Sequence, residues 1–290
     1  MEHLHPKLIN EVEKTQKERI EFICKEKWIG YSEAEKIIVE MEALLEYPSC
    51  SRMPGLLVTG DTNNGKTALL NRFYSAHPAR RNELGAGVII PVVKVQAPPI
   101  PDEKRFYNNI LDALNIPFRV NDKIEIKHRQ IVHVMRETSV KVLLIDEIHH
   151  VLAGSPTKQR MFLNIIKYIA NDICISVVCA GTKDAKAALG IDPQLSNRFE
   201  PVELPRWKLD TEYLKLLASF EKIVPLKNPS NLHTNELASK ILQMSEGRLG
   251  EISNIIKRAA IVAIQDGTER ITTNTISKIR YMNPELRRSR

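Results

Sequence analysis

The stretch Gly60-Asp61-Thr62-Asn63-Asn64-Gly65-Lys66-Thr67 decides the fold of this chain. It matches G-x-x-x-x-G-K-T, the phosphate-binding loop, in which glycines let backbone N–H groups point at phosphate oxygens. Residues 54–59 before it are short, apolar and partly β-branched, which is typical of a buried strand, and residues 68–73 after it favour a helix. A strand, this loop and a helix in that order predict a site for a nucleoside triphosphate.

Each residue type in this loop has a chemical task. The Lys66 ammonium can reach the β- and γ-phosphates, and the Thr67 hydroxyl can hold Mg²⁺. The backbone of the remaining positions, up to the first turn of the helix, cradles the phosphates. The predicted nucleotide contacts from this segment are Gly60, Asp61, Thr62, Asn63, Asn64, Gly65, Lys66, Thr67 and Ala68.

A second motif follows the apolar run Val142–Ile145. Such a run fits a strand that is buried on both faces of a parallel sheet. Asp146 and Glu147 then emerge at the carboxyl end, where ligands bind in such sheets. We expect Asp146 to complete the Mg²⁺ shell and Glu147 to orient or activate the attacking water. The alternative is a core strand that merely ends in two acidic residues, and the independent phosphate loop argues against it.

The segment Asp146–His149 also spells D-E-x-H, a pattern found in large helicases. Those enzymes need a second motor domain, for which this layout leaves no room. His149 and His150 are adjacent rather than four residues apart, so the pattern does not favour a zinc pair on one helix face. We interpret them as the start of the next loop or helix, near the γ-phosphate.

The composition is that of an ordinary globular protein, with 43% hydrophobic and 27% charged residues among 290. No apolar run approaches the ~18 residues of a membrane span, and residues 1–6 show no apolar signal-peptide core. The net charge of +7 permits a polyanionic partner without identifying one. The cysteines form no C-x-x-C pair, which fits a reducing cytoplasm; they are Cys24, Cys50, Cys174 and Cys179, the last two expected on a buried strand.

Strand and helix patterns alternate from residue 28 to residue 208, and only helical patterns follow. This alternation predicts an α/β fold with a central parallel sheet flanked by helices, followed by a small all-α lid domain. We expect four parts along the chain: an exposed N-terminal helical extension at 1–27, the α/β core at 28–208, the lid at 209–281 and a basic tail at 282–290.

A further strand is expected at 88–95, between the two site motifs. Pro91 within it suggests a sheet edge or a bulge, because proline cannot donate to the ladder. Helices are expected at 102–114 and 123–138. The extra strand between the two motifs separates this order from that of simple kinases.

Three later polar residues have the spacing of accessory groups in a nucleotide site. Thr182 follows the next buried strand, where its hydroxyl can sense the γ-phosphate; the alternative is a plain turn. Arg198 ends a short helix and is either a solvated charge or a finger that reaches a neighbouring subunit's nucleotide. Arg248 starts a helix of the lid and either reaches back to the phosphates or is solvated.

In this order the features resemble the AAA+ ATPases over about residues 28–280. The sequences of four segments resemble those of the TniB/TnsC family of transposition ATPases, and of TniB in particular. These segments are Trp28-Ile29-Gly30-Tyr31, Arg52-Met53-Pro54, the phosphate loop with its Thr-Asn-Asn-Gly-Lys core, and Asp146-Glu147-Ile148-His149-His150.

The resemblance implies a bacterial, cytoplasmic, DNA-associated protein that binds ATP and Mg²⁺ and forms rings or filaments on double-stranded DNA. It implies recruitment or activation of a DDE transposase, a TniQ-type adaptor as a further partner, and hydrolysis that dismantles the assembly. It places Glu147, Lys66 and a neighbour's Arg198 in catalysis, and Tyr31 near the adenine; the alternative for Tyr31 is a hydrophobic brace.

The same resemblance places DNA contacts between the second strand and the Asp146 strand. Basic side chains there would bind the phosphate backbone without reading the sequence. Acidic residues are interleaved with them, so a solvated helix face is the alternative for each. The candidates are Lys104, Arg105, Lys123 and Lys127.

Two other functions share parts of this pattern. A clamp- or helicase-loader has the same AAA+ motifs and differs in its partner. A nucleotide-gated signalling switch would bind nucleotide without touching DNA. No membrane partner is expected.

Overall fold

The computed structural model describes residues 3–83 and 85–288, and the chain forms two compact units. An α/β unit comprises Glu33–Thr62 and Lys66–Leu204, and a helical unit comprises Met1–Ser32, Asn63–Gly65 and Pro205–Arg290. The division near residue 204 lies close to the predicted boundary at 208. The N-terminal segment, which we expected to stand apart, is grouped with the C-terminal helices.

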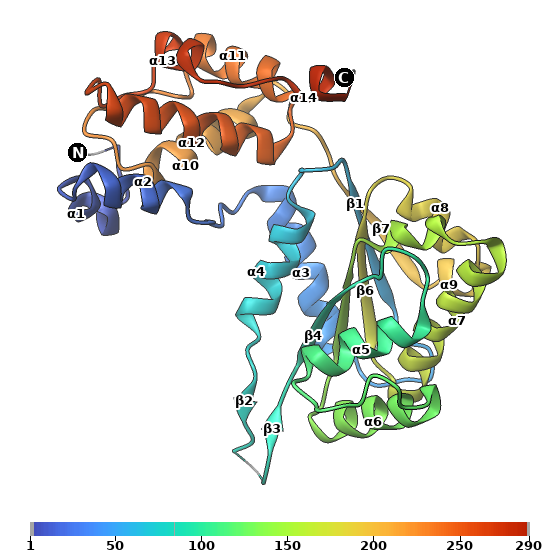
Figure 1. The fold of residues 1–290 in the computed structure, drawn as a ribbon. Helices are drawn as coiled ribbons and strands as arrows, with labels where there is room; N and C mark the ends of the chain where they lie inside the picture. Colours follow the sequence, from blue (N-terminus) through green and yellow to red (C-terminus); the bar gives the residue numbers. More distant parts are fainter. Residues whose placement is uncertain (1–2, 84, 289–290) are drawn as a thin grey trace. The chain divides into compact units, whose positions relative to one another are not determined.

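A five-stranded parallel sheet forms the centre of the α/β unit (Figure 1). The runs that were rich in apolar residues form its inner strands, which are buried along their whole length. Because β6 pairs with both β1 and β5, it separates the phosphate-loop strand from the Asp146 strand. In spatial order the strands are β4 (Val92–Gln96), β5 (Val142–Asp146), β6 (Ser176–Gly181), β1 (Gly55–Gly60) and β7 (Phe199–Leu204).

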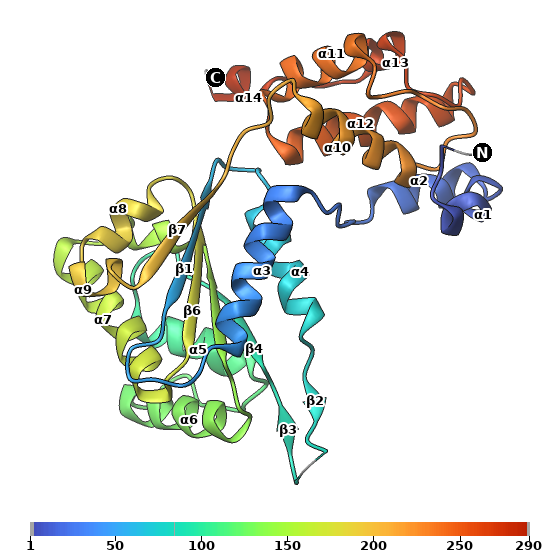
Figure 2. The same cartoon turned by 180° about the vertical axis from the view of Figure 1, so that it is seen from behind.

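Helices cover both faces of this sheet, as the sequence predicted (Figure 2). Alternate strand residues such as Leu57, Leu143 and Val177 join one core cluster with the apolar faces of three helices. Those helices are α5 (Glu103–Ala113), α6 (Ile124–Glu137) and α7 (Pro156–Ile173), and the opposite face carries α3 (Ser32–Glu46) and α4 (Lys66–Ala76). Short helical segments follow the ends of β5 and β6: η2 (Ile148–Ala153), α8 (Ala185–Gly190) and α9 (Pro193–Ser196).

The strand expected at 88–95 is divided at Pro91. Val88–Ile89 (β3) pairs with Arg80–Arg81 (β2) in an antiparallel hairpin, whereas β4 joins the main sheet at its edge. The Pro91 carbonyl accepts hydrogen bonds from the N–H groups of Lys141 and Val142 at the start of β5. Proline therefore marks the edge strand's beginning, in agreement with the predicted edge or bulge.

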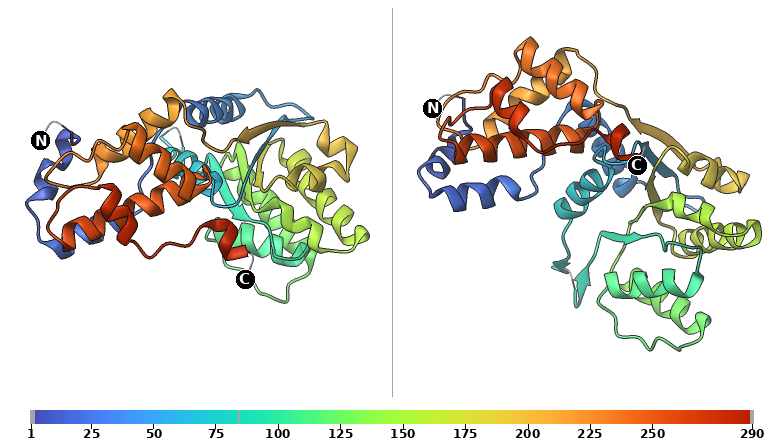
Figure 3. Two further views of the ribbon diagram at one scale, coloured as in Figure 1. Left: turned by 90° about the horizontal axis from the view of Figure 1, so that it is seen from above. Right: turned by 45° about the horizontal axis from the view of Figure 1, so that its top comes forward.

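The helical unit has its own hydrophobic core. It includes the large side chains Tyr213 and Phe220 and a row of isoleucines and alanines along α12. Helix α2 contacts α12, so N-terminal and C-terminal segments share this core (Figure 3). The elements are η1 (Pro6–Leu8), α1 (Ile9–Val12), α2 (Gln16–Cys24), α10 (Thr211–Ile223), α11 (Asn235–Ser245), α12 (Leu249–Gln265), α13 (Thr273–Lys278) and α14 (Pro284–Arg288).

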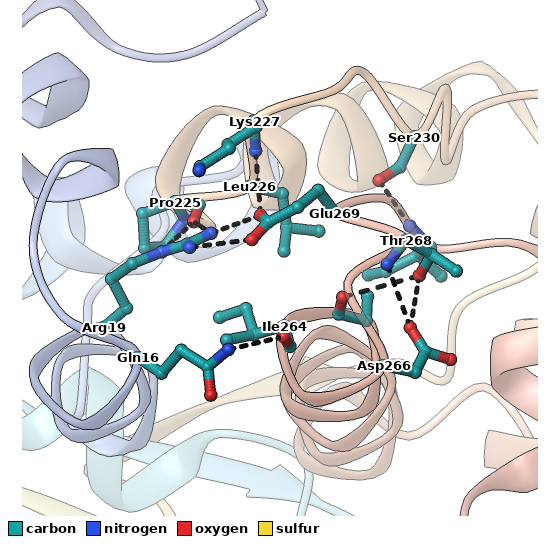
Figure 4. Close-up of polar contacts among 12 residues, drawn as sticks. Gln16, Arg19, Pro225, Leu226, Lys227, Ser230, Ile264, Asp266, Thr268 and Glu269 are labelled. Carbon is teal, nitrogen blue, oxygen red and sulfur yellow. Dashed lines mark hydrogen bonds and ion pairs between the residues drawn. The ribbon is translucent and has the colours of Figure 1, made fainter.

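The N-terminal segment is helical, as predicted, but it is not one exposed helix. A capping box formed by Thr15 and Glu18 starts a new helix, α2, inside that segment. Its Arg19 and Ile23 are each only 2% exposed. The Arg19 guanidinium donates hydrogen bonds to the Pro225 carbonyl and pairs with the Glu269 carboxylate (Figure 4). Burial of a paired arginine ties this segment to the C-terminal part of the chain.

Over residues 3–83 and 85–288, the helices all lack the combination of length and apolarity that a bilayer span requires. The cysteines are free thiols. Cys179 lies buried in β6 as expected, whereas Cys174 ends α7 in a left-handed conformation and is not on a strand. The predicted basic tail is described only as far as residue 288, and Ser289 and Arg290 lie outside the described residues.

Candidate nucleotide-binding site

The phosphate loop connects β1 to α4. Gly65 has φ +89, a left-handed conformation in which a side chain is strained, so glycine is required there. Lys66 is 6% exposed, and its ammonium donates hydrogen bonds to the carbonyls of Gly60, at 3.0 Å, and Asp61, at 2.8 Å. Burial lowers the pKa of Lys66, although the charges of Glu147, Asp146 and Asp61 oppose this shift. The ammonium is therefore held inside its own loop.

The two predicted magnesium ligands lie in direct contact. The Thr67 hydroxyl donates to Asp146 Oδ2 at 2.8 Å, and Asp146 Oδ1 accepts the Glu147 N–H at 2.9 Å. Asp146 is 5% exposed, because it ends the buried strand β5. A hydroxyl and a carboxylate at this spacing are the oxygen ligands that Mg²⁺ prefers. Thr67, Asp146 and Lys66 thus come together at the carboxyl ends of β1 and β5.

Glu147 has an unusual backbone and a specific side-chain partner. Its φ of 57° is left-handed, which is uncommon for a residue with a side chain. Its Oε2 lies 3.3 Å from His149 Nε2, and His149 Nδ1 lies 3.4 Å from the Thr182 backbone nitrogen. The Thr182 hydroxyl donates to Asp184 at 3.3 Å. The predicted water-activating residue and the predicted γ-phosphate sensor are therefore joined through His149.

His150 lies beside this group. One ligand atom from each of Glu147, His149 and His150 lies within 4.8 Å of the others, a spacing that a metal ion can bridge. His150 Nδ1 is also 3.4 Å from the Ala97 carbonyl oxygen. The sequence had suggested only that both histidines begin the segment near the γ-phosphate, and η2 does begin at Ile148.

Arg198 lies between α9 and β7. One of its terminal nitrogens donates to Asn171 Oδ1 of α7 at 2.6 Å, and among the described residues its Nε has no hydrogen-bond partner. Burial, together with the like charge of Arg52, lowers the pKa of Arg198, although the charge of Asp192 opposes the shift. Its predicted reach into a neighbouring subunit stays a prediction.

Two further predicted contacts belong to the helical unit. Arg248 is 4% exposed and pairs with Glu246 at 3.0 Å, so it is not a solvated charge. Tyr31 packs against the core of the helical unit, with its ring 5.0 Å from that of Trp207. This packing matches the brace interpretation of Tyr31. A role of either residue at the nucleotide stays a prediction.

The predicted DNA contacts differ in accessibility. Arg105 and Lys123 are exposed near the N-terminal ends of α5 and α6, and Lys104 is half-buried. The assignment of Lys127 was wrong, because its side chain is 0% exposed. Its ammonium donates to Asn108 Oδ1 at 2.5 Å and to the Val120 carbonyl at 3.2 Å. Lys127 holds the α5–α6 loop and has no accessible surface for a phosphate.

Sequence reasoning missed what the two asparagines of the loop contact. Asn64 Oδ1 accepts the Leu249 N–H at 3.1 Å, and the Asn63 carbonyl accepts the Gly250 N–H at 2.9 Å. These are the first N–H groups of α12, whose N-cap residue provides no side-chain cap. A Cβ on Gly250 would lie 2.0 Å from Asn63 Oδ1. The asparagine pair in the motif was the available signal.

The strand order β4-β5-β6-β1-β7, with a phosphate loop after β1 and Asp146-Glu147 at the end of β5, defines an AAA+ fold. Solved structures agree at the level of the fold. The Aeropyrum pernix ORC2 protein (ADPNP–ADP complexes) has a TM-score of 0.63 at 14% identity, covering 88% of this chain and 70% of that one. Cdc6p from Pyrobaculum aerophilum has a TM-score of 0.62 at 16% identity, covering 86% of this chain and 67% of that one. The Aeropyrum pernix ORC1 protein in complex with DNA has a TM-score of 0.56 at 15% identity, covering 89% of this chain and 67% of that one.

The chain belongs to the TniB family. The family profile described as "Bacterial TniB protein" matches residues 19–209. This match confirms the resemblance inferred from the sequence. No curated protein matches the chain.

Proposed function

We propose that this TniB-family protein is an ATP-hydrolysing regulator of DNA transposition that assembles on duplex DNA. The observation that carries the proposal is the contact between Thr67 and Asp146 at 2.8 Å, with the buried Lys66 in the same loop. These are the groups that bind a triphosphate and its magnesium in AAA+ folds. The nucleotide complex of the Aeropyrum pernix ORC2 protein supports ATP as the ligand.

In this proposal the chain's own groups carry out hydrolysis. Lys66 leaves the Gly60 and Asp61 carbonyls for the β- and γ-phosphates. Thr67 and Asp146 would hold Mg²⁺, which would neutralise phosphate charge. Glu147 accepts a proton from a water molecule whose oxygen attacks the γ-phosphorus. The bond from the γ-phosphorus to the β–γ bridging oxygen breaks, which yields ADP and inorganic phosphate.

The finer steps follow from family membership. Arg198 of one subunit reaches the nucleotide of its neighbour, so ATP forms part of the interface between subunits. Loss of the γ-phosphate removes bridging charge and weakens that interface. The assembly recruits a DDE transposase, and a TniQ-type adaptor binds at its end.

DNA binding is proposed at the accessible basic residues near the N-terminal ends of α5 and α6. Lys104, Arg105 and Lys123 are accessible in this region, and the chain carries a net charge of +7. The DNA complex of the Aeropyrum pernix ORC1 protein gives a precedent within the same fold. Contacts to the phosphate backbone would give affinity for any sequence.

Nucleotide binding is tested with a fluorescent ATP analogue and Mg²⁺. Lys66→Ala should reduce affinity by at least about tenfold, since a charge-assisted hydrogen bond to phosphate contributes about 1.5–3 kcal/mol. Lys186→Ala is the matched control, because it removes an exposed lysine of α8 in the same unit. Equal affinity of the two variants would contradict the assignment of the site.

Assembly is tested by electron microscopy with duplex DNA and a slowly hydrolysed ATP analogue. Filaments or rings should form with the wild-type protein and should be absent with Arg198→Ala, whose own nucleotide affinity stays unchanged. Glu147→Gln should give assemblies that persist with ATP itself. Wild-type protein that stays monomeric with ATP, magnesium and DNA would contradict the proposal.

DNA binding is tested by its salt dependence. The negative slope of log affinity against log salt should become shallower by about 0.9 for each phosphate that a combined Lys104→Ala, Arg105→Ala and Lys123→Ala variant no longer neutralises. Lys141→Ala removes one exposed positive charge directly before β5, outside the proposed interface, and should leave the slope unchanged. If the triple substitution leaves the slope unchanged, these residues do not bind DNA and the interface lies elsewhere on the protein.

The loader function predicted as an alternative shares these results on nucleotide and DNA. Its partner distinguishes it, because a loader binds a clamp or a helicase and a TniB-family regulator binds a transposase. Affinity capture with each purified partner in the presence of ATP decides between them. The match to the TniB profile favours the transposase.

A further inference from the structure

The imidazole of His149 lies between two groups that the proposed reaction needs. Its Nε2 is 3.3 Å from Glu147 Oε2, and its Nδ1 is 3.4 Å from the Thr182 backbone nitrogen. The His149 and Glu147 side chains are 21% and 31% exposed, so solvent reaches both only in part. One ring thus contacts the water-activating carboxylate after β5 and the end of the neighbouring strand β6.

The hydrogen-bond partners fix the tautomer of this ring. The Thr182 N–H can only donate, so His149 Nδ1 must be the acceptor and carries no hydrogen. In the neutral ring the hydrogen is then on Nε2, the nitrogen that lies 3.3 Å from Glu147 Oε2. Burial lowers the pKa of His149; the charge of Glu147 opposes this shift, and His150 and Lys66 add to it. The neutral form agrees with both contacts.

The end of β6 packs closely against the His149 ring. Gly181 ends β6, immediately before Thr182. A Cβ at Gly181 would lie 3.2 Å from His149 Nδ1 and 2.9 Å from the Ala185 Cβ. Because a side chain here would press on the imidazole, the absence of one is what permits the ring to approach β6 so closely.

A glutamate that activates water must present one oxygen in a defined direction. The free side chain has several rotatable bonds, and each unproductive rotamer reduces the fraction of molecules ready to react. Because Oε2 lies beside the His149 Nε2, the other oxygen of Glu147 is left to accept the proton of the attacking water. Through Nδ1, the ring also makes this orientation depend on the position of Thr182, the predicted γ-phosphate sensor.

We propose that His149 is a positioning residue for hydrolysis, which anchors the Glu147 carboxylate and links its orientation to the end of β6. This inference rests on the proposed ATPase function. It gives a task to the first histidine of the Asp146–His150 segment.

Two substitutions of His149 test its two contacts, Nδ1 with Thr182 and Nε2 with Glu147, one at a time. Asn in place of His149 offers an amide oxygen near the position of Nδ1, so it can keep the Thr182 bond but is too short for Glu147. Gln extends to the position of Nε2 and can still donate to Glu147. We expect His149→Asn to lower kcat about tenfold, a part of the 10²–10⁴-fold contribution of a general base, with ATP affinity within about twofold. His149→Gln should stay within about threefold of wild-type kcat, because the donor to the carboxylate is retained.

A double substitution shows whether His149 acts through Glu147. In a Glu147→Gln background, His149→Asn should cause no further loss of residual turnover, because the carboxylate it orients is gone. His133→Asn, at an exposed histidine of α6, is the control for the change in residue type. All assays use the full chain with duplex DNA and Mg²⁺.

The outcomes distinguish this proposal from the function on which it rests. A wild-type chain that binds no ATP or releases no phosphate overturns the proposed function, and the positioning role with it. If the wild type turns over ATP, the positioning role is overturned by wild-type kcat in His149→Asn, or by losses that multiply in the double variant. Equal losses in His149→Asn and His149→Gln, accompanied by a lower melting temperature, also overturn it, because they show a structural role.

Discussion

Replacing Arg19 by methionine tests what holds the N-terminal segment in the helical unit. Arg19 Nη1 donates to Glu269 at 2.9 Å, while Nε and Nη2 donate to the Pro225 carbonyl at 3.2 and 2.7 Å (Figure 4). The paired side chains are only 3% and 13% exposed. Methionine keeps an apolar stem of similar length and removes every donor.

The cost follows from what the substitution leaves behind. Glu269 stays mostly buried as a carboxylate, with the Lys227 N–H at 3.3 Å as a remaining donor. Removing one partner of a buried ion pair costs about 3–5 kcal/mol. Because Glu269 keeps one donor and some solvent contact, we expect the lower end, about 3 kcal/mol. With a urea m value of about 1.5 kcal/mol/M, the unfolding midpoint should fall by about 2 M.

Tryptophan fluorescence during urea unfolding measures this effect selectively. The two tryptophans of the chain, Trp28 and Trp207, both belong to the helical unit. Lys17→Met, at an exposed position of the same helix α2, is the matched control. An Arg19→Met midpoint within about 0.3 M of that control, which is about 0.5 kcal/mol, would refute the reasoning.

Four further predictions concern single residues. Lys127→Met should leave DNA affinity unchanged in a gel-shift assay and lower the free energy of unfolding by about 1–3 kcal/mol, since it orphans buried acceptors. Gly181→Ala should lower kcat for ATP without changing nucleotide affinity, because its Cβ presses on the ring beside it. Asn64→Asp should shift the urea midpoint of the tryptophan signal further down than Asn64→Ala, because it places a buried carboxylate oxygen against the Pro205 carbonyl oxygen that the amide contacts at 3.0 Å. Burial raises the pKa of Glu269, but the bonds from Arg19 and the Lys227 N–H outweigh it and hold the pKa below its usual 4.5. Its stabilisation is therefore complete above about pH 4.5 and is lost as the pH falls through the lowered value; urea midpoints from pH 6 to pH 3 should lose this dependence in Glu269→Gln.

The sheet and the geometry of the candidate site were predictable because their signals are local. A strand buried on both faces must be apolar at consecutive positions, and Val142–Ile145 shows this in the sequence itself. The phosphate loop depends on a glycine at φ +89 beside fixed functional groups, so its spacing is also visible in the sequence. Parallel pairing then brings Thr67 and Asp146 together without further information.

What the sequence could not predict depends on long-range packing. Lys127 has the pattern of a polar helix position, and its burial depends on Asn108, which lies 19 residues earlier. In the sequence, Arg19 resembles any surface charge of an exposed helix. Its acceptors are Pro225 and Glu269, which lie 206 and 250 positions later in the chain. Cys174 lies next to a β-branched run but adopts φ 56, because α7 ends there. Each error came from a side chain or turn whose state is decided by distant partners.

The asparagines of the phosphate loop explain why its full sequence carries more structural information than the generic motif. The G-x-x-x-x-G-K-T pattern constrains the glycines, the lysine and the threonine, because these groups meet phosphate and metal. The open positions carry no such demand. Here Asn64 is 2% exposed and must satisfy both ends of its amide, which it does by accepting the Leu249 N–H and donating to the Pro205 carbonyl. Only a short amide side chain offers both a donor and an acceptor at that reach. The residues of this loop therefore answer to two requirements, phosphate chemistry at the fixed positions and capping of α12 at the open ones, and the second requirement distinguishes this loop from a generic phosphate-binding loop.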